Sequence, residues 1–168
     1  MKILKILIIT ICILTVYLLC GTAYAGDREL TVDDTIAVAN QITAYETEID
    51  MLAQLVYSEA RGVKSQTEQA AVIWCVLNRA EAKTITEVIT AKHQFAYRRN
   101  LPIKEEYREL AKDVMIRYLL EQRGVSEVGR VLPKEYIYFA GRGGRNWFRC
   151  EYRGGNYWNW ALESPYED

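Results

Sequence analysis

The sequence predicts a mainly α-helical single domain of the α+β class, with short strands or loops in its C-terminal third. Apolar residues recur every three or four positions, as in amphipathic helices, over the stretches 47–61, 66–82, 85–92 and 104–123. Beyond residue 136, glycines divide the chain into short segments that are rich in aromatic residues. This pattern favours turns and short strands over helices.

The first 25 residues predict an export signal. Lys2 and Lys5 precede an uncharged apolar run over residues 6–19, and the Ala-Tyr-Ala at 23–25 fits the small-x-small rule for cleavage. The apolar run is short for a transmembrane helix, which needs about 20 residues, and an uncleaved anchor is the alternative. We therefore expect a secreted, extracytoplasmic protein with no stable membrane partner unless the signal stays uncleaved.

The remaining chain is predicted to form one domain, with a lead-in segment over residues 26–46 and the main domain over residues 47–168. The lead-in is either a short helix after Thr31 or a flexible stretch.

The charge of the chain without the signal is nearly balanced. Removal of the signal removes two lysines, so 19 of the 21 basic residues remain against 22 acidic ones. This balance excludes the basic footprint of a nucleic-acid-binding protein. No spacing of Cys and His indicates a metal, and we expect no cofactor and a monomer. Cys75 and Cys150 either form one disulfide or stay reduced, with Cys75 buried.

Glu59 occupies an unusual position for a charged residue. Its helix is predicted to begin with a capping pattern at Thr47. With residues 100° apart, Glu59 projects within about 20° of Leu52, on the apolar face, and it lies in the last turn before Gly62. Burial and the negative end of the helix dipole both favour a neutral carboxyl group, the form that a general acid needs. The alternative is a structural salt bridge to Arg61 or another arginine.

The next helix is predicted to lie in the middle of the domain, because residues 70–77 are apolar on every side. Capping boxes that begin at Ser65 and Thr84 predict the starts of this helix and of the following one. Asn78 and Arg79 end the apolar run with strong hydrogen-bonding groups, which either order a site or cap a neighbouring element.

The aromatic C-terminal third predicts a surface for sugars. Aromatic faces pack against the C–H surfaces of sugar rings, and loops place such rings at clefts. Candidates for the walls of a cleft are the aromatic residues Tyr138, Phe148 and Trp158, together with Asn146. The alternative is that most of these rings fill the core. Arginines also cluster here and would attract an anionic polymer; they are Arg142, Arg145, Arg149 and Arg153.

Several of these motifs together resemble the SleB-type cell wall hydrolase family, which includes the spore cortex-lytic enzyme that acts at germination. The resemblance covers residues 49–97 and continues more weakly over 136–160. It rests on Leu-Val-Tyr-Ser-Glu-Ala-Arg-Gly at 55–62, Ala-Ala-Val and Val-Leu-Asn-Arg within 70–79, and Gln-Phe at 94–95. Each motif alone is a weak signal, whereas the combination is specific.

The resemblance implies a lysozyme-like, lytic-transglycosylase-like domain that cleaves peptidoglycan between N-acetylmuramic acid and N-acetylglucosamine. It implies that Glu59 is the catalytic acid and that Gln94 and Phe95 line the cleft. The chain departs from the family pattern in two places. Val63 follows Gly62 where the family commonly has another Glu soon after, and the Thr-His-Phe-Tyr tail motif is absent. These departures leave the substrate preference, vegetative wall or spore cortex, open.

One carboxyl group suffices for a lytic transglycosylase. A glycoside hydrolase usually uses two acids, and we expect Glu68, Glu81 and Glu87 at solvated helix ends. In a lytic transglycosylase the muramoyl 6-hydroxyl is the nucleophile and has a high effective concentration, while one Glu acts first as acid and then as base. The alternatives are a hydrolase, or a non-catalytic peptidoglycan-binding or envelope-assembly protein on the same fold.

Overall fold

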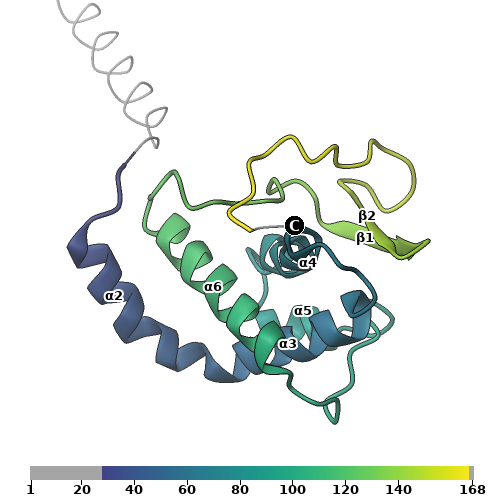
Figure 1. The fold of residues 1–168 in the computed structure, drawn as a ribbon, viewed down its shortest axis with the longest axis horizontal. Coiled ribbons are helices and arrows are strands. Elements are labelled where there is room, and N and C mark those ends of the chain that lie inside the picture. The colour runs from purple at the N-terminus through teal and green to yellow at the C-terminus, as the bar shows by residue number, and fades with distance from the viewer. Residues whose placement is uncertain (1–27, 167–168) are drawn as a thin grey trace, which may run out of the picture.

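The computed structural model describes residues 28–166, and Figure 1 shows a mainly helical fold with one small antiparallel sheet. The predicted α+β class is confirmed at this level. The predicted export signal, residues 1–25, lies outside the described residues. Within the described range, no helix has both the length and the apolar character needed to cross a bilayer.

All of the predicted helices are present, with ends that differ by up to three residues. In chain order the elements are α2 (Val32–Ile42), the short 3-10 helix η1 (Thr43–Tyr45), α3 (Glu46–Ala60), α4 (Gln66–Arg79), α5 (Ile85–Thr90), α6 (Glu105–Gln122), β1 (Tyr138–Arg142) and β2 (Arg145–Arg149). The predicted cap at Thr47 is wrong, because α3 follows η1 directly and has no side-chain cap. No residue there has the extended backbone that an N-cap side chain requires.

α4 forms the centre of the fold, as predicted. Every residue from Ala70 to Leu77 is fully buried, and α4 contacts α3, α5, α6 and both strands. The Ser65 hydroxyl caps its first turn by accepting the backbone N–H of Glu68. α5 begins with the predicted capping box between Thr84 and Glu87. These local signals set where the two helices begin, and burial of α4 sets the arrangement around it.

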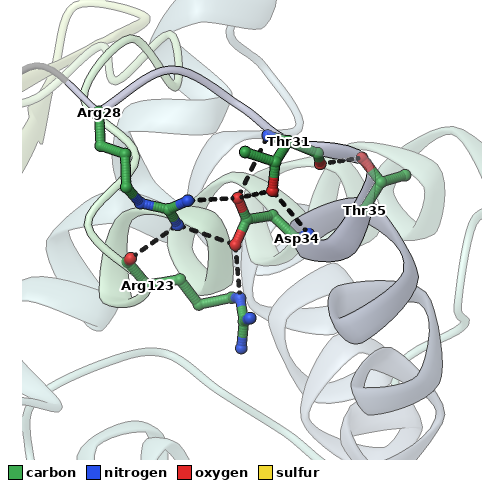
Figure 2. A network of polar contacts seen from close by, with 5 residues as sticks. All are labelled: Arg28, Thr31, Asp34, Thr35 and Arg123. Atoms are coloured by element: carbon green, nitrogen blue, oxygen red, sulfur yellow. Dashed lines mark hydrogen bonds and ion pairs between the residues drawn. The ribbon is translucent and has the colours of Figure 1, made fainter.

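The lead-in segment is a helix, α2, that packs against α6. Thr31 caps it in a capping box with Asp34, and the buried Asp34 carboxylate accepts hydrogen bonds from Arg28 (2.8 Å) and Arg123 (3.0 Å). Figure 2 shows both guanidinium groups converging on this carboxylate. Hydrogen bonds from Arg28, then from Thr31 and Arg123, hold the pKa of Asp34 far below its usual range. Because Arg123 directly follows α6, the network fastens α2 to that helix.

The hairpin of β1 and β2 has two different faces. Gly143 and Gly144 form its turn with positive φ values of 65° and 76°, as a type I′ turn requires. Phe139 and Phe148 pair on the inner face, with ring centroids 5.5 Å apart. The outer face carries the cross-strand pairs Tyr138 with Arg149, Ala140 with Trp147, and Arg142 with Arg145.

The C-terminal tail returns over α6 and the hairpin (Figure 1). The Trp158 amide donates to the Phe148 carbonyl (2.9 Å), and the Tyr166 hydroxyl donates to Asp113 Oδ2 in α6 (2.7 Å). Both described cysteines are reduced. Cys75 is buried within α4, and this burial raises the pKa of its thiol to about 12.

Candidate active site

A cavity of about 400 Å³ opens beside the last turn of α3. Its walls come from segments that are far apart in the sequence: the end of α3, the end of α4, the loop after α5, and the hairpin with the loop that follows it. Four of the predicted site residues line it, namely Glu59, Gln94, Phe95 and Tyr138. The other lining residues are Arg79, His93, Phe139, Gly141, Arg149 and Tyr152.

Glu59 is half-buried at this cavity, and its backbone belongs to the apolar helix α3. Its Oε1 accepts the backbone N–H of Ala96 at 2.5 Å. Among residues 28–166, none of the ion pairs includes Glu59. The alternative partner, Arg61, instead lies over the ring of Tyr57, 5.3 Å from its centroid. The structure therefore places Glu59 at a cavity wall and not in a buried salt bridge.

The loop of residues 93–97 forms one wall and is held from two sides. Arg79 Nη2 donates to Gln94 Oε1 at 2.5 Å, and the Arg79 guanidinium lies 5.0 Å from the centre of the Phe95 ring. At the other end, the Tyr97 hydroxyl donates to Gln54 Oε1 at 3.1 Å. Gln54, in α3, is buried and donates in turn to two carbonyl groups of residues 99 and 101. These contacts fix the loop between α3 and α4.

The hairpin forms the opposite wall. The Phe139 ring lies 6.0 Å from the Phe95 ring and so joins the two walls. The Tyr138 ring meets the Tyr152 ring edge to face at 5.8 Å. Arg149 Nη2 donates to the Tyr152 carbonyl at 3.2 Å, while its buried Nε atom has no hydrogen-bond partner. The wall thus combines aromatic faces with one guanidinium group.

The cavity carries one carboxylate and two guanidinium groups. Among the residues described, Glu59 is the only Asp or Glu that lines it. Arg79 and Arg149 line it as well, and neither takes part in an ion pair within residues 28–166. No group of three or more His, Cys, Asp or Glu side chains in this part of the chain could hold a metal ion. The cavity therefore combines one carboxylate, a group that can exchange a proton, with two guanidinium groups, which can bind an anion.

Three predicted cleft residues lie away from the cavity. Asn146 and Phe148 are only 4% and 1% exposed, because the pleat of β2 turns them to the inner face of the hairpin. Trp158 packs on Tyr136, with ring centroids 5.3 Å apart, and its Nε1 donates to the Val131 carbonyl at 3.1 Å. These side chains therefore pack inside the fold and do not line the cavity.

Glu68 also differs from expectation. It was predicted at a solvated helix start, but it is buried, and its Oε1 accepts the backbone N–H of Asn146. A carboxylate is favoured in the first turn of a helix by the helix dipole, and the bond from the Asn146 N–H to Glu68 anchors β2 on α4. It does not line the Glu59 cavity and provides no second acid there.

The sequence does not place Arg79 or Arg149 in the cleft, and it indicates Arg149 only as one of the clustered arginines that would attract an anionic polymer. Arg79 was singled out with Asn78 as a polar pair of undecided role, and the structure separates the two. Arg79 reaches the cavity, whereas Asn78 is buried and donates to the carbonyls of Pro133 and Tyr136. Arg149 reaches the cavity because the register places it opposite Tyr138, and the sequence alone does not show this pairing.

Comparison with known proteins gives no relative: no family model matches the chain, and no curated protein or solved structure does. The sequence motifs and the geometry of the Glu59 cavity are therefore the features that point to a function.

Proposed function

We propose that this protein is a peptidoglycan-cleaving enzyme with a lysozyme-like fold, related to the SleB-type cell wall hydrolases, and that it acts as a lytic transglycosylase. The observation that carries the proposal is the cavity itself. It brings Glu59 together with Gln94 and Phe95, residues 35 or more positions further along the chain. The family-like motifs suggest that Glu59 is a catalytic acid and that Gln94 and Phe95 line a cleft.

The chemistry needs one group that first gives and then takes a proton. Protonated Glu59 donates its proton to the oxygen of the breaking glycosidic bond, so that N-acetylglucosamine leaves as an alcohol. The 6-hydroxyl of the same muramoyl sugar attacks the anomeric carbon and closes the 1,6-anhydro ring, and the Glu59 carboxylate accepts the hydroxyl proton. No water is consumed. The bond from the Ala96 N–H to Oε1 orients the carboxyl group and leaves Oε2 to carry the proton.

A single acid favours this reaction over hydrolysis. Hydrolases of glycosides place two carboxyl groups about 5–9.5 Å apart across the bond, and the described lining of the cavity offers only Glu59. An internal nucleophile removes the need for a second group that activates water.

Gln94 is the group best placed to orient the sugar. Its Oε1 already accepts from Arg79, so its amide nitrogen remains to donate to a ligand carbonyl, as in an acetamido group. Arg79 and Arg149 suit a carboxylate of the peptide that the muramoyl lactyl group carries, or the lactyl carboxylate itself once that peptide is removed, because guanidinium groups bind carboxylates through two parallel hydrogen bonds. Peptidoglycan lies outside the membrane, which agrees with the expected export and a cell wall or spore cortex location.

The test is cleavage of purified peptidoglycan by wild-type protein and by Glu59→Gln. Loss of a general acid reduces the rate by about 10²–10⁴-fold, while circular dichroism of the variant stays that of the wild type. Glu81→Gln is the matched control, since Glu81 is exposed and lines no part of the cavity. Mass spectrometry identifies the products.

Three results would decide against parts of the proposal. Full activity of Glu59→Gln removes the catalytic assignment. Products that carry reducing ends of muramic acid, with no anhydro-muramic acid among them, indicate a hydrolase. Binding of peptidoglycan without any cleavage by the wild type favours the non-catalytic alternative.

A further inference from the structure

A second cavity, also of about 400 Å³, lies on the outer face of the hairpin. It is lined by Ala140, Arg142, Gly143, Arg145, Trp147 and Tyr157. The strand register explains this composition, because Ala140 opposite Trp147 and Arg142 opposite Arg145 all project from one face. We call this set of six residues the hairpin platform.

The aromatic rings of the platform are exposed although the core lies close by. Trp147 is 42% exposed and Tyr157 is 51% exposed. The two rings meet edge to face, with centroids 5.3 Å apart and planes at 68°, and this geometry leaves ring faces uncovered. The Trp147 Nε1 is turned to the Arg142 carbonyl at 3.4 Å, which holds the indole on the strand surface. An exposed aromatic pair that lines a hollow is typical of a binding surface.

The charge of the platform is positive. Arg142 and Arg145 are exposed at the tip of the hairpin, and neither takes part in an ion pair within residues 28–166. No Asp or Glu is among the residues that line this cavity. The platform therefore complements a ligand that has both flat C–H surfaces, for the rings, and carboxylates, for the guanidinium groups.

Arg149 connects the platform to the Glu59 cavity. It lines the Glu59 cavity, and its guanidinium carbon lies 5.7 Å from the centroid of the Tyr157 ring on the platform. Tyr138 and Arg149 share the outer face with the platform, four residues along β1 from Arg142. Four residues of strand cover about 13 Å, which exceeds the length of one sugar ring. A saccharide that reaches both cavities therefore has more than one sugar ring.

We propose that the hairpin platform is a second subsite that binds an anionic glycan strand, in which Trp147 and Tyr157 pack on sugar rings and Arg142 and Arg145 bind the carboxylates of the strand. This inference rests on the proposed function, which identifies the strand as peptidoglycan. It adds a site next to the Glu59 cavity, centred about 13 Å along β1 from Tyr138, and a preference for long strands over short ones.

The experiment measures binding to the full chain carrying Glu59→Gln, which prevents cleavage. The long ligand is glycan strands from which an amidase has removed the peptides, so that each muramic acid carries a free lactyl carboxylate. The short ligand is a tetrasaccharide of the same sugars. Arg142→Gln/Arg145→Gln and Trp147→Ala are each expected to reduce the preference for long strands about tenfold, the equivalent of about 1.4 kcal/mol. Lys64→Gln/Lys104→Gln is the charge-matched control, because both lysines are exposed and line neither cavity.

A neutral chitin strand of equal length separates charge from stacking. Trp147→Ala is expected to weaken both long ligands, and the double arginine variant is expected to weaken only the anionic one. If the platform variants keep the wild-type preference while the wild type still cleaves peptidoglycan, the platform is refuted and the proposed function stands. If long strands bind through the platform but no cleavage occurs, the platform stands and the proposed enzyme activity fails. Tighter binding of single-stranded RNA than of glycan refutes the platform as a glycan site.

Discussion

The Asn78 side chain joins the end of α4 to the segment that leads into the hairpin. Its Nδ2 donates to the carbonyls of Pro133 (2.8 Å) and Tyr136 (3.0 Å), and its Oδ1 accepts from Arg130 Nη1 at 2.7 Å. Asn78 is buried, so water cannot replace these bonds without opening the structure. We predict that Asn78→Ala strongly destabilises the protein.

The magnitude follows from the bonds that are lost. Each buried hydrogen bond contributes about 1 kcal/mol net, and a buried polar group left without a partner costs about 1–3 kcal/mol. Arg130 keeps its bonds to Glu121 (2.8 and 2.6 Å) and to the Leu132 carbonyl (2.9 Å), so most of the loss falls on the two carbonyls that Asn78 holds. We therefore expect the free energy of unfolding to fall by about 2–4 kcal/mol.

The assay is urea unfolding at neutral pH, followed by circular dichroism and by tryptophan fluorescence. Asn40→Ala is the matched control: Asn40 is exposed in α2, and its replacement is expected to change the free energy of unfolding by less than about 0.5 kcal/mol. A loss of less than about 0.5 kcal/mol for Asn78→Ala would refute the view that these bonds hold the hairpin on α4.

Two further predictions concern titratable groups. Alkylation of the native protein followed by peptide mass spectrometry is expected to modify the half-buried Cys150 but not Cys75, because burial raises the Cys75 pKa to about 12 and excludes the reagent; equal modification of both would contradict the buried position. Asp34 has a folded pKa far below the ordinary value of about 3.9, so its contribution to stability is complete above that value and is lost as the pH falls below it. The free energy of unfolding of the wild type is therefore expected to decrease between pH 5 and pH 3 more steeply than that of Asp34→Asn, with Asp33→Asn as control, and parallel curves for wild type and Asp34→Asn would contradict this.

The helices could be predicted because their signals are local. Residues 70–77 are apolar on every side, and the Thr84 capping box reappears in the structure with both of its hydrogen bonds. Thr47 was misassigned because the pattern alone does not show that η1 leads directly into α3. Local patterns fix the type of an element more firmly than its first residue.

The candidate site was predictable only in part, because its walls depend on contacts between distant segments. Glu59, Gln94 and Phe95 follow from motifs, whereas Arg149 reaches the cavity only through its pairing with Tyr138 across the hairpin. Asn146 and Phe148 were misplaced because composition does not show which face of a strand a residue occupies. The register of the two paired strands determines which face each residue occupies.

The last turn of α4 sets the width of the cavity. Asn78 and Arg79 are adjacent, and successive positions on a helix project about 100° apart, so the two side chains contact different segments. Asn78 holds the segment before β1, while Arg79 holds Gln94 and stacks on Phe95. A positive group at this end of the helix is favoured by the helix dipole. The segment before β1 and the loop of Gln94 are thus both bonded to α4, the central helix of the fold, and Glu59, on α3, lies at the cavity that the hairpin and this loop enclose. In the proposed reaction, we expect this arrangement of the walls to hold the muramoyl 6-hydroxyl near the anomeric carbon.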